Sequence, residues 1–297
     1  MCRKCDSYQG HHQAINTHRK HIKNLINFLM NKDIGLVWLK DDFRFKKNLA
    51  LIEATKNHDK VVAFFLYKKR KFDDQEAQKW WVSESLKKFK KKLVNYNINL
   101  EIISTNSYKS FFENLFKKKN FSIYWNRTYE PQYLQFDEFL AKNFKKNQIK
   151  FNIFKGNILN EFNEVKKSDG TPFKVFTPFW KNAEKFYTEK IPSKEKKMSK
   201  CLKKVSFFSK TINEKEIYPK QKWFKKFEQY WQPSEENALK ELEIFIVDRV
   251  KDYSNLRNFP NLLGTSKLSP YIKHGQLHVE TIWEECNKIK NNGVNKY

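Results

Sequence analysis

This chain of 297 residues carries a formal net charge of +26, and 39% of its residues are hydrophobic, with aromatic residues alone making up 16%. The apolar content excludes a wholly disordered chain, and the length is sufficient for a sizeable core and about two domains. No run of eighteen apolar residues occurs, so we expect no membrane span.

Residues 1–33 differ in composition from the rest and are predicted to be an extension before the first domain. One interpretation is a zinc site, because Cys2, Cys5, His18 and His21 follow a ligand-like pattern, although the last spacing is one residue short. The simpler interpretation is that Met30 is the true start and that the preceding residues are a mis-assigned leader.

Residues 34–165 alternate between short apolar segments and longer segments with helical periodicity. Five segments have the length and composition of buried parallel strands: 34–39, 60–67, 99–104, 121–125 and 150–154. Four helices are predicted between them: 48–57, 74–97, 108–119 and 131–147. The alternation predicts an α/β domain, a doubly wound, Rossmann-like parallel sheet with right-handed crossovers.

Residues 166–222 are rich in Lys, Ser, Thr and Pro, and their periodicity is weak. A charged connection of this length is unusual inside one domain, so we interpret it as an interdomain linker with one ordered island at 171–179. Residues 223–297 return to a helical pattern and are expected to form part of an all-α domain. Its predicted helices are 234–253, 267–274 and 278–291, and Ser234 is the expected cap of the first.

A loop rich in hydroxyl groups precedes the second of these helices. Gly264 allows a tight turn, Thr265 and Ser266 are candidate helix caps, and Pro270 suits a first helical turn. Free backbone N–H groups and hydroxyls at such a helix start suit an anion, most often a phosphate. The alternative is an ordinary capped helix.

The positive charge indicates attraction to a polyanion such as DNA. Only seven of the 59 basic residues are arginine, the residue that favours bidentate base contacts. The charge therefore favours nonspecific phosphate attraction over sequence reading. Cys201 and Cys286 are isolated, and four cysteines make no disulfide framework; with no secretory signal in the sequence, we expect a reducing cytoplasm.

Four segments, in this order along the chain, resemble motifs of the DNA photolyase/cryptochrome family, class I type. They are residues 36–45 with Asn48 and Leu51, residues 124–131, residues 170–180, and the array from Trp231 to Trp283 that contains the hydroxyl-rich loop. Leu39 replaces an aromatic residue of the family motif, and Lys40 replaces a common arginine. The ordered set is more specific than any one segment.

The resemblance implies an α/β antenna domain followed by a helical domain that holds FAD. It implies light-dependent repair of cyclobutane pyrimidine dimers, in which excited reduced FAD donates an electron to a lesion flipped out of the duplex. A second, antenna chromophore of folate or deazaflavin type is an additional expectation. The implied partner is DNA containing pyrimidine dimers. We expect no membrane association, and we expect the protein to be a monomer.

The resemblance also implies roles for particular residues. The positions that match flavin contacts of the family, or lie within the same loop, are Tyr253, Thr265, Ser266, Lys267, Leu268 and Ser269. Arg257 matches a position that faces DNA. Asn126, Arg127 and Glu130 lie where loops at the carboxyl ends of strands would contact an antenna pigment. Core packing of Tyr253 and a solvated Arg257 are the alternatives. No catalytic residue is assigned.

The chain stops at Tyr297, well before the end of the family's helical domain. We therefore expect a C-terminally truncated photolyase that shows one wall of the cofactor site, binds FAD weakly or not at all, and exposes apolar helix faces. Two other interpretations stay open: a cryptochrome-like blue-light sensor, and a non-catalytic nucleotide- or DNA-binding α/β fragment.

Overall fold

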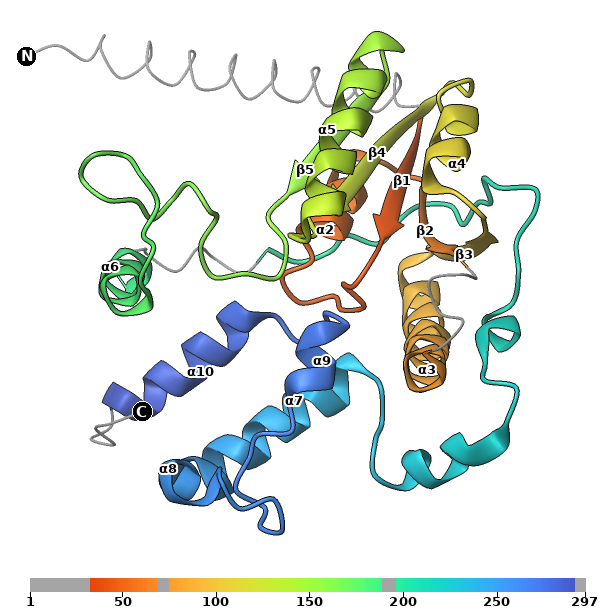
Figure 1. The fold of residues 1–297 in the computed structure, drawn as a ribbon. Helices are drawn as coiled ribbons and strands as arrows, with labels where there is room; N and C mark the ends of the chain where they lie inside the picture. Colours follow the sequence, from red (N-terminus) through yellow and green to blue (C-terminus); the bar gives the residue numbers. More distant parts are fainter. Residues whose placement is uncertain (1–32, 69–74, 189–195, 292–297) are drawn as a thin grey trace, which may run out of the picture.

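A five-stranded parallel sheet forms the centre of the first half of the computed structural model, which describes residues 33–68, 75–188 and 196–291 (Figure 1). Its strands are β1 (Ile34–Leu39), β2 (Val61–Tyr67), β3 (Asn99–Ser104), β4 (Phe121–Asn126) and β5 (Lys150–Phe154). The order is β3-β2-β1-β4-β5, and every neighbouring pair is parallel. The predicted doubly wound α/β fold is confirmed.

Each face of the sheet is covered by two helices. These are α2 (Leu49–Asn57), α3 (Glu76–Leu93), α4 (Tyr108–Leu115) and α5 (Pro131–Lys146). Successive strand side chains point to opposite faces, so Val37 of β1 packs with α2 and α3, whereas Trp38 packs with α4 and α5. The sheet is therefore buried on both sides, which explains its nearly continuous apolar strands.

Part of the predicted linker packs directly on this sheet. We call residues 196–212 the edge segment. The Cys201 side chain enters the core beside α2 and α3, and Phe207 and Phe208 pack against the opposite core. The Ile212 N–H donates to the Ile102 carbonyl at 2.8 Å. The edge segment thus belongs to the surroundings of the sheet, while the domain limits at residues 33, 165 and 222 remain a prediction.

Helices of the second half gather beyond the carboxyl ends of the strands (Figure 1). They are α6 (Phe176–Thr188), α7 (Glu235–Ile244), α8 (Tyr253–Leu256), α9 (Ser269–Lys273) and α10 (Val279–Asn291). Trp80 and Trp81 of α3 pack with Leu242 of α7, Tyr271 of α9 and Leu277. We call residues 235–291 the helical segment. This third core joins the helical segment to the α/β domain. In the described ranges, no helix has both the length and the apolar character needed to cross a bilayer.

The stretch predicted as one helix at 234–253 is helical, but it is not a regular α-helix throughout. Ser234 caps α7 as expected, accepting from the Asn237 N–H at 3.2 Å. After Ile244 the chain forms a π-helical turn (Phe245–Arg249) and a 3₁₀ turn (Val250–Asp252) before α8. This stretch is rich in β-branched residues, which lose rotamer freedom in an α-helix, so helical periodicity alone was insufficient.

Candidate functional site

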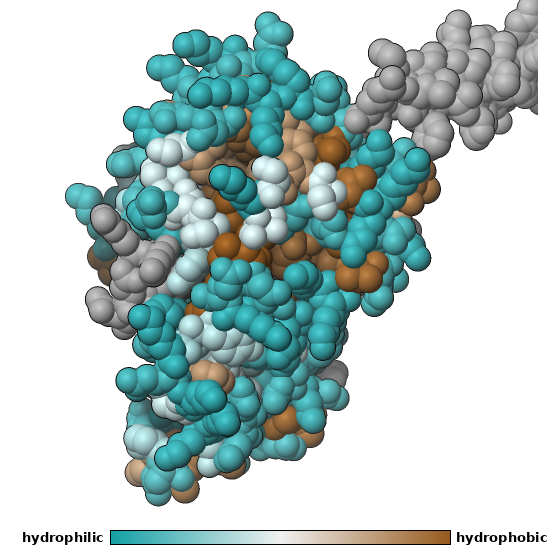
Figure 2. Space-filling view, turned by 90° about the vertical axis from the view of Figure 1, so that its right-hand side faces the viewer, coloured by the Kyte–Doolittle hydropathy of each residue, from teal (hydrophilic) through white to brown (hydrophobic). Residues whose placement is uncertain are grey.

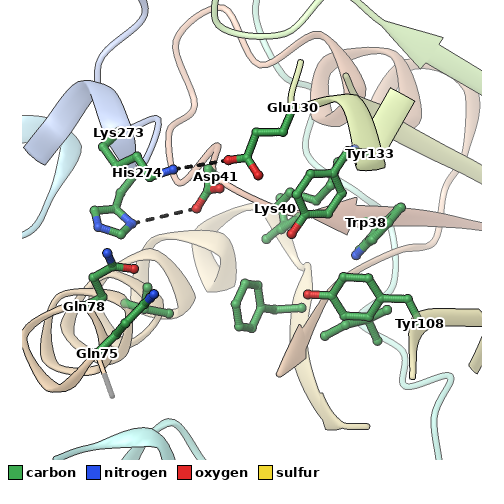
Figure 3. A pocket seen from close by; sticks show the side chains of 14 residues that line it. Trp38, Lys40, Asp41, Gln75, Gln78, Tyr108, Glu130, Tyr133, Lys273 and His274 are labelled. Carbon is green, nitrogen blue, oxygen red and sulfur yellow. Dashed lines mark hydrogen bonds and ion pairs between the residues drawn. The ribbon is translucent and has the colours of Figure 1, made fainter. Parts of the chain in front are cut away.

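A pocket of about 220 Å³ opens at the carboxyl edge of the sheet. The strand order reverses between β1 and β4, and in open α/β sheets this switch point is where a ligand crevice forms. β1 leads into Lys40 and Asp41, and Glu130 follows β4. Tyr133 of α5 and His274 at the end of α9 complete opposite sides (Figure 3). The pocket therefore lies between the sheet and the helical segment.

Lys40 forms the buried, positively charged side of this pocket. Its side chain is 7% exposed, and its Nζ lies 3.6 Å from an Asp137 carboxylate oxygen and 4.7 Å from the centre of the Trp38 ring. Within the described residues Nζ makes no hydrogen bond. Burial lowers the pKa of Lys40 and raises that of Asp137, whose other contact is the Trp125 indole N–H at 2.9 Å. Lys40 is thus a buried cation in the pocket wall, paired with Asp137.

The opposite rim comes from α9. His274 stacks on Trp81, with ring centres 5.9 Å apart, and its Nδ1 lies 3.8 Å from Asp41 without a hydrogen bond to any described residue. Lys273 reaches Glu130 at 3.5 Å. These contacts close the pocket between elements separated by more than 130 residues, and Figure 3 shows both spanning the opening.

Gly275 fixes the approach of α9 to the sheet. Its φ is +60°, a left-handed value that favours glycine, and an added Cβ would overlap the backbone of Asp41 and Asp42. The Arg44 side chain, 1% exposed, donates to the Gly275 carbonyl at 2.9 Å. A second tie is Glu235, whose carboxylate accepts from the Phe45 N–H at 3.0 Å. The loop after β1 therefore anchors the helical segment.

Asn126 lies in a buried hydrogen-bond network that ties β4 to the loop after β1 and to α2. It is 3% exposed, donates to Asp42 at 2.7 Å and to Asn48 at 2.8 Å, and accepts from the Ala50 N–H at 3.2 Å. Arg127 pairs with Glu161 at 3.1 Å, beside a separate groove. Of the three predicted antenna contacts, only Glu130 borders the carboxyl-edge pocket.

The hydroxyl-rich loop lies beside α8. Gly264 does not take a positive φ. An added Cβ would overlap Leu256 of α8, so glycine allows close packing here. The Thr265 carbonyl accepts from Arg249 at 3.4 Å. Tyr253 packs edge-on against Phe245 at 5.6 Å and lies under Arg257 at 5.8 Å. The hydroxyl-rich loop therefore packs against α8, the helix that begins with Tyr253.

The predicted capping of α9 is wrong in detail. Leu268 is the N-cap and makes no side-chain cap bond, while the Ser266 hydroxyl accepts from the Leu268 N–H at 3.4 Å in a local turn. Lys267 takes a φ of +55° and is exposed, as are Thr265 and Ser269, whereas the Leu268 side chain is buried. The loop presents hydroxyls and one lysine on an open wall.

The proposed zinc ligands Cys2, Cys5, His18 and His21 lie outside the described residues. Across residues 33–68, 75–188 and 196–291, no group of three or more His, Cys, Asp or Glu side chains could hold a metal ion.

A family model, DNA photolyase, matches residues 35–197, which is more than half of the chain. The chain belongs to the DNA photolyase family. Similarity to individual relatives extends beyond residue 197 and covers 84% to 90% of the chain.

A deoxyribodipyrimidine photo-lyase of Agrobacterium fabrum is 28% identical over 248 residues, covering 84% of this chain and 52% of that protein. Cryptochrome-2 of Arabidopsis thaliana is 24% identical over 265 residues, covering 86% of this chain and 43% of its own. The crystal structure of a class III photolyase from Agrobacterium tumefaciens has a TM-score of 0.77 at 25% identity, covering 90% of this chain and 55% of that one. The chain spans about half the length of these relatives.

Proposed function

We propose that this chain forms the light-harvesting half of a DNA photolyase that repairs cyclobutane pyrimidine dimers. Its α/β domain would hold an antenna chromophore, and its helical segment would supply one wall of an FAD site. The observation that carries the proposal is the carboxyl-edge pocket at the sheet's switch point, where Lys40 Nζ and His274 Nδ1 lack hydrogen-bond partners among the described residues. We further propose a monomeric, cytoplasmic protein.

The chemistry of the pocket favours a planar heteroaromatic ligand that carries hydrogen-bond acceptors. Trp38, Tyr108 and Tyr133 supply aromatic surface, and Gln75 and Gln78 add amides (Figure 3). The buried Lys40 donor suits a ring carbonyl or a carboxylate. Chromophores of folate or deazaflavin type have both properties.

Residues of the hydroxyl-rich loop fit an FAD diphosphate in chemistry. Thr265, Ser266 and Ser269 offer hydroxyls, and Lys267 offers a charge. When bound, reduced FAD would supply the excited electron for repair; the chain's own residues would bind and orient it, with Tyr253 packing beside the loop. Because this wall is exposed, we expect the chain alone to bind FAD weakly, and the DNA contact of Arg257 is a proposal on the same footing.

Chromophore titration tests the antenna proposal. The purified chain is titrated with 5,10-methenyltetrahydrofolate and, separately, with an 8-hydroxy-deazaflavin, following ligand fluorescence. We expect saturable binding of one of them, weakened about tenfold by Lys40→Met through loss of a charged hydrogen bond. Lys142→Met, at an exposed lysine of α5, is the control. Binding of neither chromophore, or equal effects of the two variants, would contradict the antenna site.

Flavin absorbance after purification tests the open wall. A stoichiometric yellow chromophore would show that the chain closes a complete FAD site.

The likeness to cryptochrome-2 favours a light-sensor function as the second candidate. Loss of cyclobutane dimers under blue light, with FAD supplied, favours repair; bound FAD and chromophore with an undiminished number of dimers favours sensing.

A further inference from the structure

Exposed lysines gather at the amino edge of the sheet, where the strands begin, opposite the chromophore pocket. The carboxyl end of each helix lies beside the start of the next strand in this fold, so lysines from several elements meet there. The exposed lysines of this edge are Lys117, Lys118, Lys119, Lys145, Lys146, Lys150, Lys203 and Lys204. This edge is uppermost in Figure 1, and Figure 2 shows hydrophilic side chains covering that end of the molecule.

Direct contacts join these lysines into one surface. Lys119, just after α4, donates to the carbonyl of Asn147 at the end of α5 at 3.5 Å. Lys118 Nζ lies 4.7 Å from the centre of the Phe207 ring in the edge segment. The edge segment is held to the start of β2, because the Lys203 N–H donates to the Asp59 carbonyl at 3.3 Å. The lysines therefore sit on rigid, packed elements.

Two carboxylates, Asp33 and Asp59, share this edge and act on His58 together with Lys150. None of the eight lysines forms an ion pair with a carboxylate of the described residues. Glu101, beside the edge segment, is 6% exposed, and its carboxylate accepts from the Phe207 and Phe208 N–H groups at 2.9 to 3.2 Å. That acid is turned inward, so it does not face the lysines across solvent.

We propose that the amino edge binds the phosphate backbone of duplex DNA without preference for sequence or lesion. Five strands spaced about 4.8 Å apart give an edge of roughly 19 Å, along which a duplex presents about eleven phosphates. Lysine binds phosphate as a point charge and reads no sequence. This contact is separate from the repair site and would hold the protein on undamaged DNA.

The scarcity of exposed apolar side chains in the edge segment favours DNA over a membrane surface. Membrane-binding faces combine lysines with several exposed apolar side chains. In the edge segment, Leu202 is the one large apolar side chain that is exposed, and Phe207 and Phe208 pack against the core. Anionic vesicles are therefore the contrasting arm of the test.

Fluorescence anisotropy with an undamaged 20-base-pair duplex tests the proposal. The variants are K117Q/K118Q/K119Q and K145Q/K146Q, and the control is K222Q/K225Q/K226Q, which removes exposed lysines from the 3₁₀ turn Lys222–Gln229, distant from this edge (Figure 1). We expect at least tenfold weaker binding at 50 mM salt for the first variant, and a log–log salt slope smaller by about two to three. The control should stay within about threefold of the unmodified chain.

Three results would overturn the proposal: edge variants that bind DNA like the unmodified chain, an equal loss in the control, or binding to phosphatidylserine vesicles without duplex binding. Circular dichroism of each variant verifies folding. The methenyltetrahydrofolate titration should be unchanged in the edge variants, so failure here and failure of the antenna site are distinguishable.

Discussion

Lysines at the carboxyl edge of the sheet are matched by carboxylates, whereas the eight exposed lysines of the amino edge form no ion pair with another described residue. Lys155 reaches Glu280 of α10 at 2.9 Å, Lys47 also pairs with Glu280, and Lys273 pairs with Glu130. The same residue type thus has two uses in one domain. At the carboxyl edge it joins the helical segment to the sheet, and at the amino edge it leaves charge available to a polyanion. Stability should therefore depend strongly on the first edge and weakly on the second.

The largest effect is expected for Arg44→Met. The variant loses the bond to the Gly275 carbonyl and removes the cation that most favours the charged form of the buried Asp42. Because breaking a buried charged pair is costly, urea unfolding should show a loss of about 3–5 kcal/mol. Arg257→Met, at an exposed arginine, is the matched control. A loss below about 1 kcal/mol for Arg44→Met would remove the anchoring role.

Gly275→Ala comes next, because the added methyl overlaps the Asp41 backbone and φ is positive. We expect a loss of about 3 kcal/mol in free energy of unfolding. Gly170→Ala is the control: its φ is also positive, at +79°, but nothing lies within 4 Å of an added Cβ. It should cost only about 1 kcal/mol. Equal losses would mean that backbone conformation, and not close docking, explains both.

Acid should weaken the docking of α10 through His278. Its Nε2–H donates to the Gly156 carbonyl at 3.3 Å and its Nδ1 accepts from the Glu280 N–H at 3.1 Å, so only the neutral ring fits. Burial, reinforced by nearby cations, lowers the pKa of His278 to about 2. Below pH 6.5 the unfolded chain binds a proton that the folded one does not, so this stability is present above pH 6.5 and declines as pH falls towards 2.

Chemical unfolding at pH 7 and pH 5 measures this effect. The His278 contribution to the loss over that range is about 2 kcal/mol. His278→Gln has no titrating ring, so the decline should be smaller in this variant by that amount, even though its stability at pH 7 is lower. An unchanged pH dependence in the variant would show that His278 does not govern acid sensitivity.

The smallest effect is expected at the amino edge. K145Q/K146Q removes two exposed lysines from the last turn of α5, where they favour the helix dipole only weakly. The free energy of unfolding should change by less than about 1 kcal/mol, measured in urea at neutral pH. A larger loss would show that these lysines support the fold, and would end the contrast between the two edges.

The sheet could be predicted from sequence because its signals are local. The strands β1, β3 and β5 have the predicted limits, and the other two differ by one residue. The change to π-helical and 3₁₀ geometry after Ile244 was missed, since the spacing of apolar residues does not reveal it. The edge segment was missed as well, because its polar, lysine-rich sequence conceals the few apolar side chains that dock on the sheet.

The candidate site was predicted only in part. The hydroxyl-rich loop was identified because its residues are contiguous, and Glu130 because it follows a strand. Lys40, Tyr108 and His274 meet only in three dimensions, so spacing along the chain could not unite them. A usable signal was present: Lys40 directly follows β1, the strand at which the sheet order reverses.

The edge segment has a practical consequence for protein engineering. A fragment that ends at residue 165 would lack Cys201 and Ile217 from its core and would leave the Glu101 carboxylate without its backbone donors. An exchange of α/β domains within the DNA photolyase family should therefore graft the stretch through residue 217 together with the sheet. Chimeras joined earlier would expose apolar side chains of the sheet that the edge segment covers, and Glu101 would lose the two N–H groups that bind it.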